Sequence, residues 1–193
     1  MSKPANNSNT KTNPIASVYE WVEVICVALF AVVLLFTFVC RLVTVSGESM
    51  ENTFYNGDRL IISDLFYEPK AGDVVVVQNV NIHEFRGPII KRVIATENDI
   101  VDIDSENWKI TVTHSDGSVT VYEDEPYVKR RDAKMESGFI KYPYTVEEGH
   151  VFVMGDNRNN STDSRMIGSI DERMILGKVY LRVAPNPAID FSK

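Results

Sequence analysis

A continuous apolar run near the N-terminus constrains this chain more than any other feature. Residues 24–40 read VICVALFAVVLLFTFVC and carry no charge. With the apolar residues on either side, the run is long enough to cross a bilayer as a helix. Glu20 and Glu23 precede it and Arg41 follows it, where charged side chains can reach headgroups and water. The run therefore predicts a transmembrane helix over residues 18–44.

Two other interpretations of this run are a cleaved secretory signal and a buried core helix. A secretory signal usually has a shorter apolar core and a basic leader, whereas this leader is rich in Asn, Ser, Thr and Pro. A core helix usually keeps a polar face for water, which this run lacks. We therefore expect an anchor, preceded by a disordered tail over residues 1–17. The Lys and Arg residues on the two sides do not decide the orientation.

Charge and composition exclude several kinds of partner and site. The formal net charge of −7 gives a nucleic-acid partner no electrostatic support. Three His and two Cys residues are too few and too scattered for a zinc or iron–sulfur site. Cys26 and Cys40 both lie in or at the end of the apolar run. In a helix they stand about 21 Å apart along the axis, beyond disulfide reach.

Beyond residue 45 the sequence has the pattern of strands rather than of helices. Residues 108–113 alternate apolar and polar side chains, Asp116-Gly117 supplies a turn, and the alternation resumes over 119–121, which predicts a hairpin. Other short apolar runs predict strands at 60–62, 74–77, 151–154 and 178–183.

Residues 123–148 mix both charges with Pro and Gly and predict a solvated connection. We therefore expect a β-rich body over residues 45–193, with a hairpin-containing insert region over 106–145. A single such body is expected to be monomeric.

Lys91 is a candidate general base. In a strand, Ile89, Lys91 and Val93 share one face, so either Lys91 or its neighbour Arg92 can point outward while the other points toward a core. A lysine amine is a base only when neutral, which costs roughly 4.6 kcal/mol at pH 7 from an ordinary pKa of ~10.4. Burial among apolar side chains can lower that pKa by about 3–5 units. The alternative is an edge-strand lysine that discourages aggregation.

Ser49 is the matching candidate nucleophile. It lies in the segment SGESMENTF, residues 46–54, directly after the apolar run. A serine in a Gly-containing turn often has no other role. A nucleophilic serine needs a base within hydrogen-bond reach, and serine–lysine pairs are a known arrangement. None of the three histidines, His83, His114 and His150, lies in a segment of triad character.

The most polar segment of the chain directly follows the strand predicted over residues 151–154. It reads GDNRNNSTDSR over residues 155–165, and its two Asp–Arg pairs with Asn and Ser suit a buried hydrogen-bonded network. Such a network can support the Lys91 side chain and fix the orientation of its amine.

In this order after one apolar span, the three segments resemble the conserved boxes of bacterial type I signal peptidases, most closely the short single-span variety. Residues 155–168 match the family's GDNRxxSxDSRxxG pattern at every fixed position. Ser49-Met50 matches the nucleophile box and Lys91-Arg92-Val93 matches the lysine box. The resemblance extends from about residue 18 to residue 185, nearly the whole chain.

The resemblance implies a fold that is mostly β: an N-terminal transmembrane helix, then a catalytic body of two connected antiparallel β-sheet regions. It implies a membrane-bound serine endopeptidase that removes signal peptides from secretory preproteins at A-x-A-like sites. Ser49 would form the acyl-enzyme, with its N–H in the oxyanion hole, and Lys91 would be the general base. Ser161 would hydrogen-bond the Lys91 amine, and Asp163 with Arg165 would form a supporting ion pair. The N-terminus would be cytoplasmic and the body extracytoplasmic, at the cell membrane. The resemblance implies no metal and no cofactor.

The chain departs from the family's pattern in places. Asn52 stands where proline is usual, and Gly47 stands where some relatives place an oxyanion-hole serine. Two other functions fit part of the pattern. One is a self-cleaving SOS-type repressor, which would need a DNA-binding module, and the other is a catalytically inactive, membrane-tethered β domain serving as an adaptor. We expect Ser49 and Lys91 to be essential for cleavage and Arg92 to matter much less.

Overall fold

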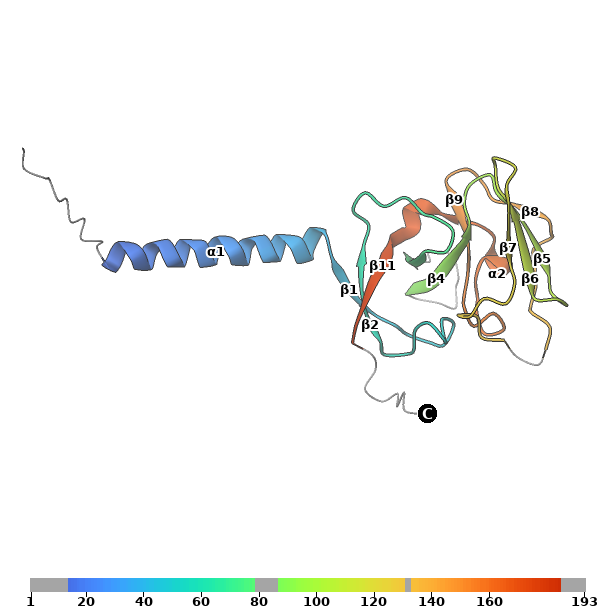
Figure 1. Ribbon diagram of the computed structural model, residues 1–193, viewed down its shortest axis with the longest axis horizontal. Helices are drawn as coiled ribbons and strands as arrows, with labels where there is room; N and C mark the ends of the chain where they lie inside the picture. The colour runs from blue at the N-terminus through green and yellow to red at the C-terminus, as the bar shows by residue number, and fades with distance from the viewer. Residues whose placement is uncertain (1–13, 79–86, 131–132, 185–193) are drawn as a thin grey trace, which may run out of the picture. The chain divides into compact units, whose positions relative to one another are not determined.

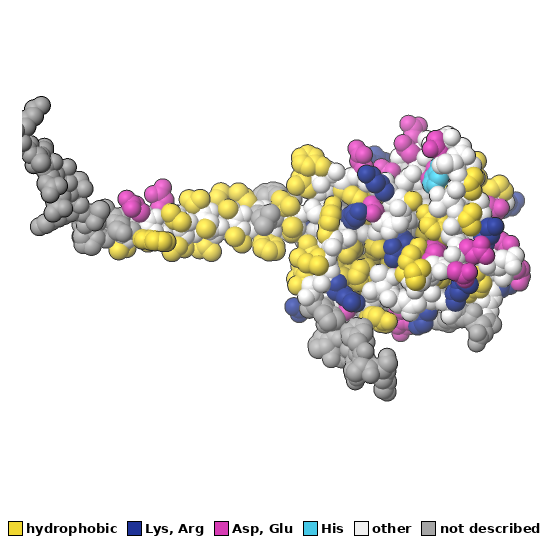
Figure 2. All heavy atoms as spheres, viewed as in Figure 1, with side chains coloured by type: hydrophobic (Ala, Val, Ile, Leu, Met, Phe, Trp, Pro, Cys, Tyr) yellow, Lys and Arg dark blue, Asp and Glu magenta, His cyan; other side chains and the backbone are white. Residues whose placement is uncertain are grey.

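The computed structural model describes residues 14–78, 87–130 and 133–184 and divides into two units, Met1–Val39 and Cys40–Lys193 (Figure 1). The first unit holds helix α1, Pro14–Phe38. Figure 2 shows apolar side chains along this helix, with acidic side chains toward its N-terminal end. Of the tail expected over 1–17, residues 1–13 lie outside the described residues and the rest are helical.

The helix is shorter at its C-terminal end than the sequence predicted. It ends at Phe38, and Arg41–Thr44 forms strand β1 instead. These residues pair one for one with β2, Arg59–Ser63, from Arg41↔Ile62 to Thr44↔Arg59. The β-branched pair Val43-Thr44 suits this extended pairing. Within the described ranges, no helix has both the length and the apolar character that a membrane crossing requires.

The second unit is built from two antiparallel sheets, as expected (Figure 1). One sheet has seven strands in the order β1-β2-β11-β3-β4-β9-β10, and the other has four in the order β7-β6-β5-β8. The remaining strands are β3 Val74–Gln78, β4 Pro88–Ala95, β5 Ile100–Asp104, β6 Lys109–Thr113, β7 Val119–Tyr122, β8 Tyr144–Thr145, β9 His150–Met154, β10 Ile170–Asp171 and β11 Ile175–Ala184. Helix α2, Ser164–Ile167, and a 3₁₀ turn, Glu172–Met174, complete the unit.

The strands that the sequence predicted all form, and the predicted hairpin is β6–β7. The segment 123–148 is not simply a solvated connection. Met135 and Val146 are fully or almost fully buried in one core with β4, β5, β6 and β9. This core also contains Phe152, and it joins the two sheets. The segment therefore covers an apolar surface that the sequence pattern did not reveal.

Strand β4 determines where the site lies. It pairs with β3 from Val74↔Arg92 to Gln78↔Pro88, but with β9 only from Arg92↔Met154 onward. Beyond Met154 the chain leaves β9 into the polar segment 155–165. The first half of β4 therefore borders that segment, and Lys91 lies at the point where β9 ends.

Candidate active site

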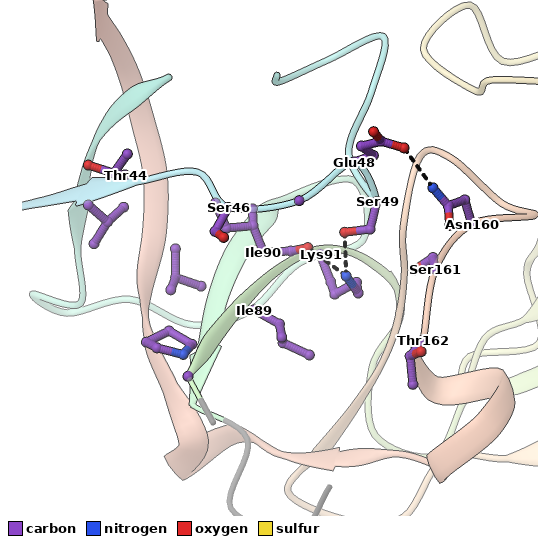
Figure 3. Close-up of a pocket in the computed structure, with 15 residues that line it drawn as sticks. Thr44, Ser46, Glu48, Ser49, Ile89, Ile90, Lys91, Asn160, Ser161 and Thr162 are labelled. Carbon is purple, nitrogen blue, oxygen red and sulfur yellow. Dashed lines mark hydrogen bonds between the residues drawn. The ribbon is translucent and has the colours of Figure 1, made fainter. Parts of the chain in front are cut away.

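Three segments far apart in sequence surround one cavity of about 900 Å³ (Figure 3). They are the segments that the sequence analysis singled out, here represented by residues 43–49, 87–91 and 160–162, and Val76 adds to the lining. Ser49, Lys91 and Ser161 are therefore brought to one cavity. Neither His114 nor His150 lines it, and His83 lies outside the described residues.

The Lys91 amine and the Ser49 hydroxyl are in direct contact at the cavity wall. Lys91 Nζ lies 2.7 Å from Ser49 Oγ and donates a second hydrogen bond to the Ile90 carbonyl at 3.1 Å (Figure 3). Ser49 is placed by its neighbour Met50, which is 2% exposed and packs in the core of β2 and β3. The Met50 carbonyl accepts hydrogen bonds from Thr53 and Phe54, which close the turn. The turn over residues 49–54, named the nucleophile turn after the role expected for Ser49, is thus fixed by the burial of Met50.

The surroundings of Lys91 favour its neutral form. Its side chain comes from the middle of a strand, and the residue is only 3% exposed. Burial lowers the pKa of the amine from 10.5 to about 8, and Arg165 also lowers it, while Asp163 and Asp156 act in the opposite direction. At pH 7 roughly a tenth of such amines are uncharged. An amine of this kind can accept the proton of a serine hydroxyl at neutral pH.

Asp163 and Arg165 form a fully buried ion pair within the polar segment 155–165. Arg165 donates to the Asp163 carboxylate from Nε and Nη2, both at 2.8 Å, and the Gly155 N–H adds a third bond at 2.9 Å. Burial raises the pKa of Asp163, but Arg165 outweighs it and the net pKa lies below the usual value. The other guanidinium donors reach the carbonyls of Glu136 and Arg158. The carboxylate of Asp163 and the guanidinium of Arg165 therefore both have hydrogen-bond partners. Because these bonds link several parts of the 155–165 segment, the ion pair stabilises its conformation.

Ser161 lies at the cavity beside this pair but does not make the expected bond to Lys91. Its hydroxyl is buried and has no hydrogen-bond partner within the part of the chain that the structure describes. The residue packs closely against Gly155, where an added Cβ would lie 2.3 Å from Ser161 Oγ. A direct role of Ser161 in orienting the amine therefore stays a prediction.

Arg92 differs from the expectation that one of the two basic residues in β4 points outward. It is only 9% exposed and binds Asp156 through two hydrogen bonds, from Nε at 2.8 Å and from Nη2 at 2.7 Å. Its guanidinium carbon lies 3.9 Å from the ring centroid of Tyr127. The partner Asp156 is 64 positions away in sequence, so the strand pattern alone did not reveal it. Both faces of β4 therefore carry a buried basic side chain, Lys91 on one and Arg92 on the other.

We expect Arg92→Ala to lower the free energy of unfolding by about 3 kcal/mol, because Asp156 is left as a buried carboxylate without its cation. The contact between Lys91 and Ser49 does not involve Arg92, so the folded fraction should still cleave substrate. Urea titration and activity measured well below the midpoint separate the two effects.

Arg173→Ala is the matched control, since Arg173 pairs with Asp171 at the surface with a side chain that is 90% exposed. It should leave the urea midpoint unchanged. A loss of stability of the same size in both variants would contradict the assignment of Arg92 to a buried pair.

The 155–165 segment is hydrogen-bonded to the nucleophile turn, which the sequence patterns did not predict. The Asn157 N–H donates to the Ser49 carbonyl at 3.0 Å, and the Asn160 amide donates to the Glu48 carboxylate at 3.1 Å (Figure 3 shows the latter). Asn52, in the usual proline position, has a φ of 82°. Proline cannot adopt that value, whereas asparagine tolerates it. The turn after Ser49 is therefore closed here by a left-handed asparagine.

The chain is similar to known proteins over most of its length. The family model "Signal peptidase, peptidase S26" matches residues 18–184. The signal peptidase I of Bacillus licheniformis is 32% identical over 177 residues, which are 86% of this chain and 88% of that protein. A probable signal peptidase I-1 of Synechocystis is 30% identical over 188 residues, 91% of this chain and 89% of that protein.

A crystal structure of a signal peptidase I from Enterococcus faecalis is 22% identical, with a TM-score of 0.41, and covers 59% of this chain and 98% of that one. The family match spans most of the chain and includes Ser49, Lys91 and the 155–165 segment. The chain therefore belongs to the signal peptidase family, peptidase S26, and is an enzyme of the signal peptidase I kind.

Proposed function

We propose that this enzyme is a membrane-bound endopeptidase that removes signal peptides from secretory preproteins, with Ser49 as nucleophile and Lys91 as general base. The observation that carries the proposal is the 2.7 Å contact between Lys91 Nζ and Ser49 Oγ. A serine hydroxyl beside a buried amine of lowered pKa, at the wall of an open cavity, has what nucleophilic catalysis requires.

The reaction proceeds through an acyl-enzyme in two steps, acylation and deacylation. Ser49 Oγ attacks the scissile carbonyl as Lys91 takes its proton, and the oxyanion accepts a hydrogen bond from the Ser49 N–H. Collapse breaks the C–N bond, and the Lys91 ammonium returns the proton to the leaving amine of the mature protein. Lys91 then deprotonates a water that attacks the ester. When the ester bond breaks, the Lys91 ammonium returns this proton to Ser49 Oγ, and the signal peptide leaves with a free C-terminal carboxyl group.

An extended peptide suits this cavity better than a folded surface. One wall is the chain between β1 and Ser49, and the other is the half of β4 that lacks a β9 partner. Such edges bind a peptide by adding it as a strand. The apolar side chains of Val76, Ile89 and Ile90 line the space between them. This lining suits apolar substrate side chains, and cleavage in A-x-A-like sites is proposed from the similarity to signal peptidases.

Membrane attachment through residues 18–38 of helix α1 and an extracytoplasmic body are part of the proposal and rest on the residue pattern. Alkaline carbonate extraction of membranes from cells that express the full chain tests the attachment. Protease added to intact spheroplasts should digest the body and spare a tag at the N-terminus. Recovery of the chain in the carbonate supernatant would remove this part of the proposal and leave the chemistry intact.

The activity itself is tested by incubating the detergent-solubilised full chain with a secretory preprotein. We expect one new N-terminus, after an A-x-A-like site, identified by sequencing the product. Ser49→Ala serves as the blank, because it retains the cavity and loses the nucleophile. A product that forms equally with wild type and Ser49→Ala would contradict the assignment.

The alternative of an inactive membrane-tethered adaptor predicts preprotein binding without turnover. The direct contact of Lys91 with Ser49 disfavours it, since a binding domain has no need of a buried amine beside a hydroxyl. Binding measured together with product formation distinguishes the two functions.

The rate should depend on pH through Lys91. Its pKa is lowered to about 8, so the neutral, active form grows as the pH rises. We expect kcat/KM to increase about tenfold per pH unit below pH 8 and to level off above it. Initial rates between pH 6 and 10, on a substrate without titratable groups near the cleavage site, give the midpoint. A midpoint near 10 would mean that the amine is not buried during the reaction.

A further inference from the structure

Asn157 holds the nucleophile turn at two consecutive peptide groups. It is completely buried, and its own N–H donates to the Ser49 carbonyl at 3.0 Å. Its side-chain amide donates to the Glu48 carbonyl at 3.1 Å. The carbonyls before and after the Ser49 nitrogen are thus both anchored to one residue of the 155–165 segment.

The orientation of this side chain is determined by its partner. A carbonyl oxygen only accepts, so the NH₂ end of Asn157 must face Glu48. The Oδ1 end is then buried without a hydrogen-bond partner among the described residues. A buried unpaired acceptor typically destabilises a fold, so stability alone does not account for an asparagine at this position.

The anchored Glu48 carbonyl fixes the direction of the Ser49 N–H. Among the described residues the only cis peptide is Tyr142–Pro143, so the Glu48–Ser49 peptide is trans. In a trans peptide the C=O and the N–H point in opposite directions. The Ser49 N–H is therefore turned away from Asn157, and within the described chain it donates no hydrogen bond. It is free to stabilise a charge that appears during the reaction.

We infer that Asn157 is a positioning residue that orients the Ser49 N–H as an oxyanion donor. The inference rests on the proposed attack by Ser49. An N–H that rotates by a fraction of its range no longer points at the oxyanion, and loss of one such donor lowers kcat by about 10²–10³-fold. Asn157 does not contact the Lys91 amine, so it acts on the transition state and not on the base.

Two variants test this role. Asn157→Leu removes the donor and the unpaired acceptor at similar volume, and Asn157→Asp keeps the shape but cannot donate when ionised. For both we expect kcat on a preprotein to fall about 10- to 100-fold, with KM within about twofold. The midpoint of the pH profile should stay unchanged for Asn157→Leu. Its melting temperature should stay close to wild type, because the orphan acceptor is gone.

Asn107→Ala is the matched control, because Asn107 donates a side-chain hydrogen bond to the Asp104 carboxylate and does not line the cavity. It should keep kcat within about twofold. Full kcat in folded Asn157→Leu and Asn157→Asp would overturn the inference, and so would an equal loss in Asn107→Ala or a change confined to KM.

Acylation of Ser49 by p-nitrophenyl acetate, followed by mass spectrometry, reports on the same oxyanion without a preprotein. We expect the acylation rate of the Asn157 variants to fall in parallel with kcat. If the wild type is acylated but cleaves no preprotein, the proposed function fails while the acylation rates still decide the role of Asn157. Acylation rates equal to wild type in both variants would overturn that role.

Discussion

Lys91→Met should reduce preprotein cleavage by about 10⁴-fold or more while the protein stays folded. Removing the base leaves the Ser49 hydroxyl without a proton acceptor, and loss of one member of such a unit removes most of its catalysis. Methionine has nearly the length of lysine and no charge to desolvate. Because the Lys91 side chain is almost fully buried with a pKa of about 8, the variant should be at least as stable as wild type at pH 7. Turnover and urea titration on the same preparation measure both effects.

The stability difference has a defined pH dependence. The folded pKa of Lys91 lies below its unfolded value of 10.5, so the unfolded chain binds more protons between pH 8 and pH 10.5. Wild type should therefore gain stability relative to Lys91→Met as the pH rises through that window. Lys109→Met, in strand β6 of the other sheet, is the control and should retain full activity. Wild-type turnover by Lys91→Met would end the case for this base.

The sequence patterns predicted those strands whose own residues carry the signal. β-Branched runs and the Asp116-Gly117 turn sufficed for the hairpin and for the central strands. Strand β1 was missed because Leu42, Val43 and their neighbours continue an apolar run that suits either a helix or a strand. Pairing with β2 decides in favour of the strand, and that pairing is a tertiary contact.

The candidate site shows the same division. Residue types and spacing made Ser49, Lys91 and the polar 155–165 segment candidates, and the resemblance to signal peptidases supplied the role predicted for each. The burial of Arg92 and the hydrogen bonds of Asn157 to the nucleophile turn were not predicted, because both depend on partners more than 60 positions away in sequence. The role of a side chain that supports the reacting groups without touching substrate depends on how distant segments pack around it.

Gly155→Ala should lower cleavage by at least about 10²-fold, because no space exists for a methyl group at this position. A Cβ there would lie 2.3 Å from Ser161 Oγ, 2.6 Å from Ser161 Cβ and 2.6 Å from the Ser49 carbonyl oxygen. A flexible hydroxyl can rotate away, but the Ser49 backbone must move. A shift of that turn by an ångström separates Oγ from the Lys91 amine, which needs hydrogen-bond reach.

The effect of this substitution is steric and not torsional, since the φ of Gly155 is not in the left-handed region. Gly117→Ala provides the opposite case: its φ is 85°, yet a Cβ there meets nothing within 4 Å. It should cost about 1 kcal/mol of stability in the β6–β7 turn and leave kcat unchanged. Adding Ser161→Gly to Gly155→Ala removes two of the three close contacts but not the one with the Ser49 backbone, so we expect the double variant to stay impaired. Recovery of wild-type kcat in the double variant would show that crowding of Ser161, and not displacement of the nucleophile turn, is what the glycine prevents.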